Sequence, residues 1–307
     1  MNGVINVYKE RNFTSHDVVA KLRGILKQKK IGHTGTLDPD ATGVLPVCLG
    51  KATKLCDVIS TWDKSYRATL LLGKETDTED TSGQVLKESE VNVTEEEIRQ
   101  IIHSFIGTYG QIPPMYSAKK VQGKKLYELA REGKVIERKP CQVTITSIEI
   151  IDVDLPYITF DVSCSKGTYI RSLCRDIGEK AGCGGCMSKL IRTRVSDFQI
   201  EDAITLSEVE NYRDSNQLTE YIRSIDSVFP FYPAVLVGDK GTRLLMNGNT
   251  VPIRYTKEIS SDVILDMTGE EHEDMYRIYD KEQHFIGLYK KDEEKGVYKP
   301  EKLFFDL

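Results

Sequence analysis

The sequence lacks the short motifs that mark several large classes of enzyme. It contains no GxxxxGK(S/T) phosphate-binding loop, no GxGxxG motif after a strand, no HExxH zinc motif and no GxSxG nucleophile elbow. Nucleotide-dependent transfer, dinucleotide redox chemistry and metalloprotease chemistry therefore have no support in the sequence.

Long hydrophobic runs are also missing. No stretch approaches the roughly 18 apolar residues that a transmembrane helix needs, and the N-terminal segment MNGVINVYKERNFTSHDVV has no continuous apolar region of the signal-peptide type. Seven cysteines, an odd number scattered through 307 residues, do not resemble a secreted disulfide framework. We therefore expect a cytoplasmic, reducing location.

Two of the cysteines form the CxxC pair Cys183-Gly-Gly-Cys186. A zinc site would need a second pair or a neighbouring histidine at ligand spacing, and neither is present. We interpret the pair as two thiols in a glycine-rich turn between helical segments, and we predict no metal site.

Charge is distributed unevenly along the chain. The formal net charge is −5, which is not typical of a nucleic-acid-binding protein as a whole. Residues 115–139 nevertheless hold eight Lys or Arg against three Glu, whereas residues 262–274 hold six acidic residues and no Lys or Arg. The basic run is either one exposed helix face or part of a phosphate-binding face. We predict that the acidic run points away from any phosphate-binding face.

The hydrophobic patterns predict an α+β protein. Strands and helices do not alternate regularly, which favours a mixed or antiparallel sheet with flanking helices. The expected strands are residues 3–8, residues 66–73 and two strands within 141–165. Three helices are expected: one begins at Thr14, one begins at Thr94, and one spans residues 168–181.

A second domain is expected after the segment Phe229-Pro230-Phe231-Tyr232-Pro233. Beyond it, the short strand-like runs AVLV, VILDM, MYRIYD and HFIGLY recur between Gly, Asp and Asn residues. We therefore expect a main domain of residues 1–230 and a small β-rich domain of residues 231–307.

Four polar clusters in apolar surroundings are candidates for chemistry. In GHTGTLDPDATGVLPVCLG (32–50), glycines and prolines shape a stiff loop around His33 and Asp38. The others are 64–66, 111–120 and 164–171, which supply Lys, Tyr and Arg. An arginine beside an aspartate would hold it ionised, tyrosines stack on bases, and lysines bind phosphates. Each side chain also has a purely structural interpretation, such as an Asp38 that only stabilises its own turn.

Residues 33–54, HTGTLDPDATGVLPVCLGKATK, closely resemble the signature of the TruB family of tRNA pseudouridine synthases. GVINVYKERNFTSHDVVAKLR resembles the family's N-terminal motif, although KERN stands where the family usually has Lys-Pro-x-Gly. The resemblance extends over nearly the whole chain. Its further motifs are QIPPMYSAKKVQGKKLYELAREG, SCSKGTYIRSLCRDIG, IRTRVSDF and a C-terminal segment similar to a PUA RNA-binding domain.

This resemblance implies an enzyme that isomerises uridine to pseudouridine without metal or cofactor. Its implied target is the T-loop uridine of tRNA, position 55. The implied catalytic residues are Asp38, Tyr66, which stacks on the flipped base and is a candidate for moving a proton, and Arg171, which pairs with Asp38. The residues implied to contact RNA are His33, Lys166, Tyr169, Leu190 and the basic pair Lys119 and Lys120.

The chemistry agrees with these implied roles. A base inside a folded arm must be flipped out before its glycosidic bond can be broken. The carboxylate then attacks C6 or C1′ or removes the 2′ proton, and the sequence does not choose among these routes. We expect a monomer that binds the T arm of tRNA without a membrane or an obligatory protein partner. The alternative is a non-catalytic RNA-binding or tRNA-folding protein on the same scaffold.

Overall fold

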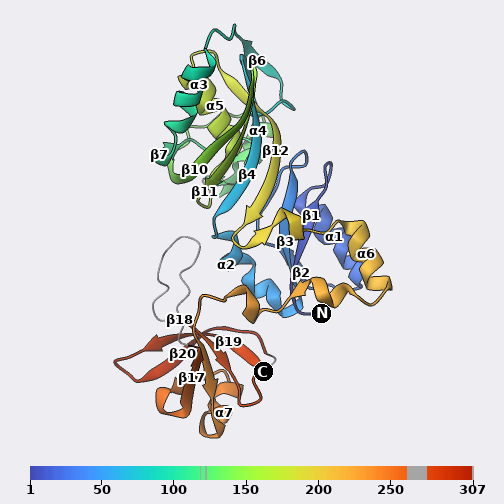
Figure 1. Cartoon of the computed structure of the whole chain (residues 1–307), viewed down its shortest axis with the longest axis vertical. Helices are drawn as coiled ribbons and strands as arrows, with labels where there is room; N and C mark the ends of the chain where they lie inside the picture. The colour runs from blue at the N-terminus through green and yellow to red at the C-terminus, as the bar shows by residue number, and fades with distance from the viewer. Residues whose placement is uncertain (118, 122, 261–274, 306–307) are drawn as a thin grey trace.

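The computed structural model describes residues 1–117, 119–121, 123–260 and 275–305. Three parts are stacked along its long axis (Figure 1). One large sheet runs through the upper and middle parts, and a second sheet forms the lower part. This architecture confirms the α+β prediction.

The large sheet has ten strands and is mixed. Every pairing in it is antiparallel except that of β3 with β12, which is parallel. Its order is β14 (Ile222–Arg223), β1 (Gly3–Lys9), β3 (Thr42–Leu49), β12 (Gly185–Val195), β4 (Lys64–Leu72), β11 (Tyr157–Cys164), β10 (Cys141–Asp154) and β7 (Gly107–Gln111), with β2 (Ile31–His33) beside β3 and β13 (Phe198–Gln199) beside β12.

Helices flank this sheet and bury its apolar side chains. In the middle part, α1 (Ser15–Leu26) and α6 (Leu206–Asp214) pack on β1 and β3. In the upper part, α3 (Glu95–His103) and α5 (Ile170–Lys180) pack on β4, β10 and β11 (Figure 1). The upper part also contains the hairpin of β5 (Lys74–Thr76) and β6 (Val85–Glu88). The helix α2 (Cys56–Ser60) lies between the middle and lower parts, where its Ile59 packs in one buried cluster with Val4 and Phe229.

The predicted helix starts are confirmed by their caps. The side chain of Thr14 accepts a hydrogen bond from the Asp17 N–H, and the Asp17 carboxylate accepts one from the Thr14 N–H at 2.8 Å. Thr94 and Glu97 make the same reciprocal pair at the start of α3. Each of these reciprocal pairs, known as a capping box, satisfies backbone N–H donors that have no partner within the helix.

The lower part is β-rich, as predicted. Three of the four expected runs are strands: AVLV, MYRIYD and HFIGLY; the fourth, VILDM, and the acidic run 262–274 lie outside the described residues. The order of this sheet is β16 (Val251–Pro252), β20 (Val297–Leu303), β19 (Phe285–Asp292), β18 (Met275–Tyr279), β15 (Ala234–Val237) and β17 (Thr256–Ser260), and α7 (Asp239–Met246) follows β15.

An aromatic cluster joins the two sheets. Phe229 and Tyr232 in the connecting segment pack in one buried cluster with Leu288 and Phe304 of the lower part. The Lys54 ammonium also donates a hydrogen bond of 2.6 Å to the Leu303 carbonyl. The lower sheet is therefore packed against the large one rather than tethered only by a linker.

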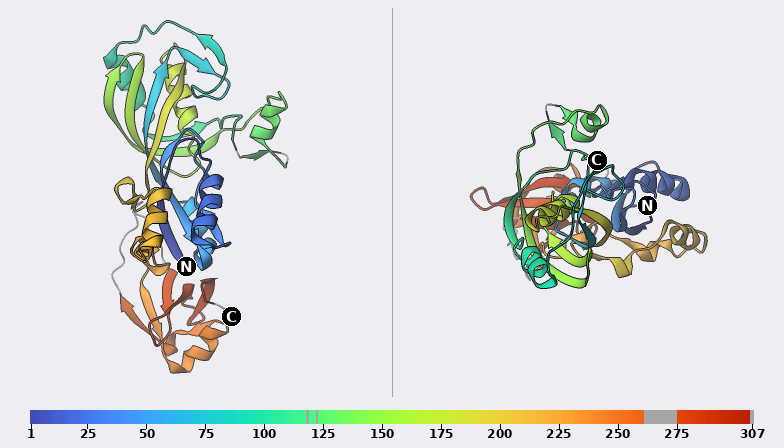
Figure 2. Two further views of the ribbon diagram at one scale, coloured as in Figure 1. Left: turned by 90° about the vertical axis from the view of Figure 1, so that its right-hand side faces the viewer. Right: turned by 90° about the horizontal axis from the view of Figure 1, so that it is seen from above.

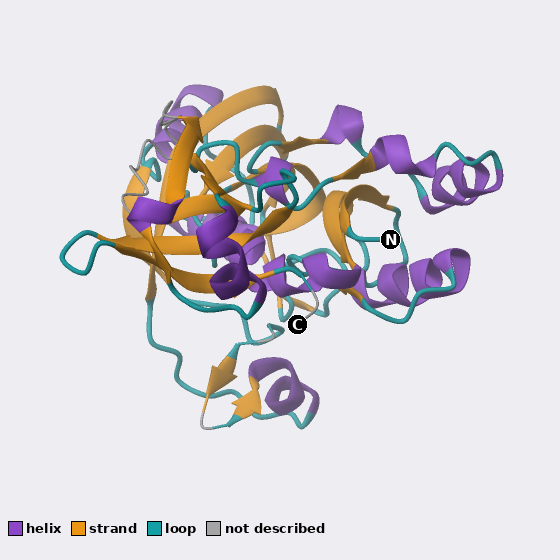
Figure 3. Ribbon diagram, turned by 90° about the horizontal axis from the view of Figure 1, so that it is seen from below, coloured by secondary structure: helices purple, strands orange, loops and turns teal. Residues whose placement is uncertain are grey.

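The basic run 115–139 is not one helix face. It forms a projecting arm in which a hairpin of β8 (Lys120–Val121) and β9 (Lys124–Lys125) precedes the short helix α4 (Leu126–Arg131). Figures 2 and 3 show that this arm stands apart from the body of the molecule on extended connections. The Lys and Arg residues of this run are thereby carried on a projection and not on a face of the main body.

Cys183 and Cys186 are both buried free thiols. Cys183 lies in the turn after α5, but Cys186 belongs to β12, so the turn joins a helix to a strand and not two helical segments. Burial raises the pKa of Cys186 to about 11 and keeps that thiol protonated.

Within the described residues, no helix is long and apolar enough to cross a membrane.

Candidate active site

The Asp38 loop lies where the two halves of the large sheet meet. It connects β2 to β3, and β3 pairs with β12 through only two residue pairs, one of which is Gly43 with Arg192. Gly43 has a φ of +105°, and a Cβ there would lie 2.2 Å from the Arg192 carbonyl oxygen. Glycine is required because the strands approach too closely for a side chain.

Neighbouring elements hold the Asp38 loop on both sides. The Leu37 N–H donates to the Ser15 hydroxyl of α1 at 2.8 Å. The buried Lys9 ammonium donates to the carbonyls of Ala41 at 2.6 Å and Pro39 at 3.1 Å. These contacts hold the chain on either side of Asp38 and thereby fix the direction of its side chain.

The departure from Lys-Pro-x-Gly does not remove the turn at the end of β1. Asn12 adopts the left-handed conformation, with φ of 67°, which asparagine tolerates better than most residues. Its N–H donates to the Pro39 carbonyl at 3.0 Å. The segment therefore still braces the Asp38 loop.

Asp38 and Arg171 form a two-point ion pair. Arg171 Nε lies 3.1 Å from Asp38 Oδ2, and Arg171 Nη2 donates to Asp38 Oδ1 at 3.3 Å. The arginine side chain is only 8% exposed, whereas that of Asp38 is 41% exposed. A buried cation thus presents a carboxylate that still reaches solvent, which suits a group that acts on an incoming substrate.

Arg171 is itself held by segments that the sequence places far apart. Its Nη1 donates to the Thr78 carbonyl at 3.1 Å and its Nη2 to the Tyr116 carbonyl at 2.9 Å. Asp80 Oδ2 lies 3.7 Å from Nη1. The guanidinium is therefore oriented before substrate arrives.

Burial dominates the electrostatics of Asp38. It raises the pKa of Asp38 above that of an ordinary aspartate, and the negative charge of Asp80 adds to this effect. Arg171 acts in the opposite direction, as the sequence predicts, but does not outweigh burial. Asp38 is therefore a more basic carboxylate than a solvated one.

Tyr66 lies on β4 and is buried beside this pair. Burial raises the pKa of Tyr66 to about 12, so that its phenol is protonated at neutral pH. The Arg192 guanidinium bonds to Tyr66, and its Nε donates to the Val44 carbonyl at 2.7 Å. Arg192 is only 1% exposed and connects β12 to both Tyr66 on β4 and the start of strand β3.

We expect Arg192→Met to lower the free energy of unfolding by about 2 kcal/mol or more, because it leaves the buried Val44 carbonyl without its hydrogen bond. Urea unfolding followed by circular dichroism measures this loss. Lys189→Met, at an exposed position of the same strand, serves as the control. An unchanged midpoint for Arg192→Met would show that the buried guanidinium has no structural role.

Three further predicted residues lie on elements that adjoin the Asp38 loop or carry Arg171. His33 ends β2 and its Nδ1 accepts a 3.3 Å bond from the Gly35 N–H, while burial lowers the pKa of the imidazole. Tyr169 immediately precedes α5. The side-chain amide of Gln111 donates a hydrogen bond to the Tyr169 carbonyl and accepts one from the Tyr169 N–H. Leu190 packs in the apolar cluster that also contains Tyr66.

Other predicted residues are not in direct contact with Asp38. Lys166 is exposed in the loop before α5. Lys119 lies at the base of the arm, where its ammonium contacts the Cys141 thiol. The side chain of Lys120 lies outside the described residues.

Sequence reasoning missed Asp80, Arg192 and Lys9. Asp80 lies in the TDTEDTSG stretch, whose composition predicts only a polar loop. Arg192 belongs to the IRTRVSDF motif, which also contains Arg194, and no local signal marks Arg192 as the buried one of the two. Lys9 was noted only as part of a variant turn, although it is fully buried.

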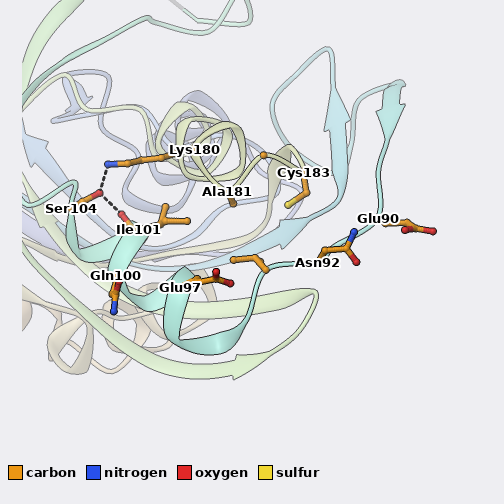
Figure 4. A pocket seen from close by; sticks show the side chains of 11 residues that line it. Glu90, Asn92, Glu97, Gln100, Ile101, Ser104, Lys180, Ala181 and Cys183 are labelled. Atoms are coloured by element: carbon orange, nitrogen blue, oxygen red, sulfur yellow. Dashed lines mark hydrogen bonds between the residues drawn. The ribbon is translucent and has the colours of Figure 1, made fainter.

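A hollow in the upper part lies away from these residues. It has a volume of about 560 Å³ and is formed between α3 and the end of α5, with Ile101, Lys180 and Cys183 in its wall (Figure 4). None of the predicted site residues lines it. The candidate active site is therefore defined by the chemistry around Asp38 and not by the size of a cavity.

Solved structures with a similar fold indicate the class of protein to which this chain belongs. The crystal structure of a Cbf5-Nop10-Gar1 complex contains a similar chain, with a TM-score of 0.73 and 27% identity over 99% of this chain and 85% of the other. The structure of an H/ACA RNP bound to a substrate RNA containing 2′-deoxyuridine gives a TM-score of 0.72 and 25% identity over 99% and 85%. The fold and the site define a pseudouridine synthase, which is an isomerase.

Sequence comparison identifies the family. Residues 23–170 match the model of the TruB family pseudouridylate synthase N-terminal domain, and residues 171–229 match the tRNA pseudouridylate synthase B C-terminal domain. The tRNA pseudouridine synthase B of Lachnoclostridium phytofermentans is 54% identical over 99% of this chain and 100% of its own length. That of Clostridium perfringens strain SM101 is 46% identical over 100% of both chains. The chain belongs to the TruB family.

Proposed function

We propose that this protein converts the T-loop uridine of tRNA, position 55, into pseudouridine, with Asp38 as the catalytic group. The observation that carries the proposal is the partly exposed Asp38 carboxylate held at two points by the buried Arg171. The names of the relatives, tRNA pseudouridine synthase B, support tRNA as the substrate.

The reaction is an internal rearrangement of one nucleoside. The bond between C1′ and N1 breaks, the uracil turns, C5 joins C1′, and the proton on C5 moves to N1. Asp38 starts the reaction in its ionised form. It either attacks C6 or C1′ or removes the 2′ proton. Arg171 keeps the carboxylate directed toward the flipped nucleotide.

The neighbouring side chains suit the other parts of this reaction. Tyr66 stacks on the flipped uracil, and its raised pKa makes it a neutral phenol and not a base when the substrate enters. Leu190 forms an apolar wall for the ring. His33 holds the displaced T-loop, while Tyr169 and Lys166 contact the adjoining nucleotides.

The rest of the chain supplies RNA contacts at longer range. Lys119 and Lys120 belong to the basic arm, which is suited to phosphates of the T stem. Residues 231–307 form a separate RNA-binding domain beside the main domain of residues 1–230. We propose that the protein acts as a monomer without a protein partner, although a similar solved chain is in a complex with Nop10 and Gar1.

An unmodified tRNA transcript labelled with tritium at C5 of uridine tests the proposal directly. We expect tritium release with no added metal or nucleotide, and one carbodiimide-dependent stop in primer extension, at the T-loop uridine. A transcript with cytidine at that position should give neither signal. Binding without release would favour a tRNA-folding protein on this scaffold, and a stop elsewhere would contradict the position.

We expect Asp80→Asn to move the acidic limb of the kcat/KM profile to lower pH. The negative charge of Asp80 raises the pKa of Asp38, so its removal allows Asp38 to stay ionised in more acidic solution. Asp40→Asn is the matched control, because Asp40 acts in the same direction but more weakly. A limb that moves to higher pH, or equally in both variants, would contradict this electrostatic account.

A further inference from the structure

Glu79 is a buried carboxylate in the loop that contacts Arg171. Residues 77–84 connect β5 to β6, and this loop supplies the Thr78 carbonyl and the Asp80 carboxylate to the guanidinium. Glu79 lies between these two contacts in the sequence and is only 8% exposed. A glutamate is almost never buried to this extent unless it is paired. Its burial therefore indicates that specific partners hold it in place.

Both carboxylate oxygens of Glu79 are bonded to α5. The Ser172 hydroxyl donates to Oε2 at 2.6 Å, and the Arg175 guanidinium donates to Oε1. These two partners are three positions apart and thus lie on one face of the helix. Ser172 is fully buried and follows Arg171 directly in the sequence. A lysine at position 175 would still supply positive charge to Glu79. The carboxylate is therefore bonded to α5 immediately beside the residue that pairs with Asp38.

The backbone of Glu79 has a conformation that needs support from such contacts. Its φ is +64°, in the left-handed region, which is sterically costly for most residues other than glycine. The Glu79 carbonyl accepts from the Met187 N–H of β12 at 3.0 Å, and the Thr81 N–H donates to the Met187 carbonyl at 3.0 Å. With this turn held in place, the residues on its two sides, Thr78 and Asp80, contact the same guanidinium.

We propose that Glu79 positions Arg171 by fixing the loop whose Thr78 carbonyl and Asp80 carboxylate contact that guanidinium. The bonds from α5 to the Glu79 carboxylate offset the steric cost of the left-handed turn. Arg171 in turn directs Asp38, so this inference rests on the proposed role of Asp38 in pseudouridine formation. Glu79 is a positioning residue and not a catalytic one, because its effect on Asp38 is transmitted through Arg171.

Hydrogen exchange of the full-length protein without tRNA tests whether Glu79 fixes the loop. In Glu79→Ala, which removes both contacts to α5, the amides of residues 76–84 should exchange about tenfold faster than in wild type, whereas those of α3 should be unchanged. Ser172→Ala removes one of the two contacts and should give a smaller acceleration. Glu88→Ala is the matched control, because Glu88 lies on β6 of the same hairpin and its side chain is 65% exposed. It should leave exchange in this loop unchanged.

Single-turnover tritium release tests whether the loop acts through Arg171. Glu79→Ala should lower the rate by about tenfold while tRNA affinity, measured by filter binding, stays within about twofold of wild type. In an Arg171→Lys background, the same substitution should lower the rate by less than about twofold, because the lysine no longer makes the contacts that the loop provides. A general loss of stability would instead lower the rate equally in both backgrounds.

Three results would overturn the proposal. One is unchanged exchange of residues 76–84 in both Glu79→Ala and Ser172→Ala. Another is a rate for Glu79→Ala within twofold of wild type, and the third is an equal loss of rate with arginine or lysine at position 171. Absence of tritium release by the wild type would refute the proposed function, whereas the exchange experiment would still decide whether Glu79 fixes the loop.

Discussion

Asp38→Asn is expected to bind tRNA normally and to form no detectable pseudouridine. The amide has nearly the same shape as the carboxylate and can still contact Arg171, but it can neither attack carbon nor accept a proton. We expect the single-turnover rate to fall by about a thousandfold or more. Tritium release measures the rate, and filter binding of the same transcript measures the affinity.

Asp40→Asn is the matched control for this experiment. Asp40 lies two residues further along the same loop and pairs with Arg11 at an exposed position, 57% exposed for its side chain. It should release tritium at close to the wild-type rate. Turnover by Asp38→Asn within tenfold of wild type would refute the assignment of Asp38 as the catalytic group.

Arg171→Lys is expected to lower the single-turnover rate by about a hundredfold with little change in tRNA affinity. Lysine keeps the positive charge but cannot contact both oxygens of Asp38 in one plane, nor reach the Thr78 and Tyr116 carbonyls together. The carboxylate then loses its fixed direction, which affects the reaction more than binding. Rapid-quench tritium release and filter binding separate the two effects.

Arg175→Lys, one turn later on α5, distinguishes orientation of Asp38 from support of the helix. Arg175 binds Glu79 and Asp176 rather than Asp38. Its replacement should lower the melting temperature while leaving the single-turnover rate within about threefold of wild type. If both variants lost the same rate for the same loss of stability, a specific role for Arg171 would be contradicted.

Local signals explain why much of the fold was predictable. In each capping pair, Thr14 with Asp17 and Thr94 with Glu97, the two partners are three positions apart in the sequence. The start of each helix can therefore be predicted from a short stretch of sequence. Around Asp38, proline restricts the chain locally, and glycine allows backbone conformations that other residues rarely adopt. The importance of Arg171 was accessible because its motif resembles that of a known family.

Other features depended on contacts between distant segments. The basic run 115–139 has the composition of a solvated helix face, yet most of it forms a hairpin arm and an extended return. Asp80 reaches Arg171 across 91 positions of sequence, and Lys9 reaches Ala41 across 32. No local sequence pattern predicts these two contacts, because the order in which the strands pair brings the residues together.

The sequence by itself determined the fold class, the irregular loop that carries Asp38 and the family to which the chain belongs, since each rests on residues close together in the chain. Only the tertiary structure decided how strongly Asp38 holds its proton. Burial, the charge of Asp80 and the guanidinium of Arg171 act on one carboxylate through space, and their balance exists only when β3, β12 and α5 meet.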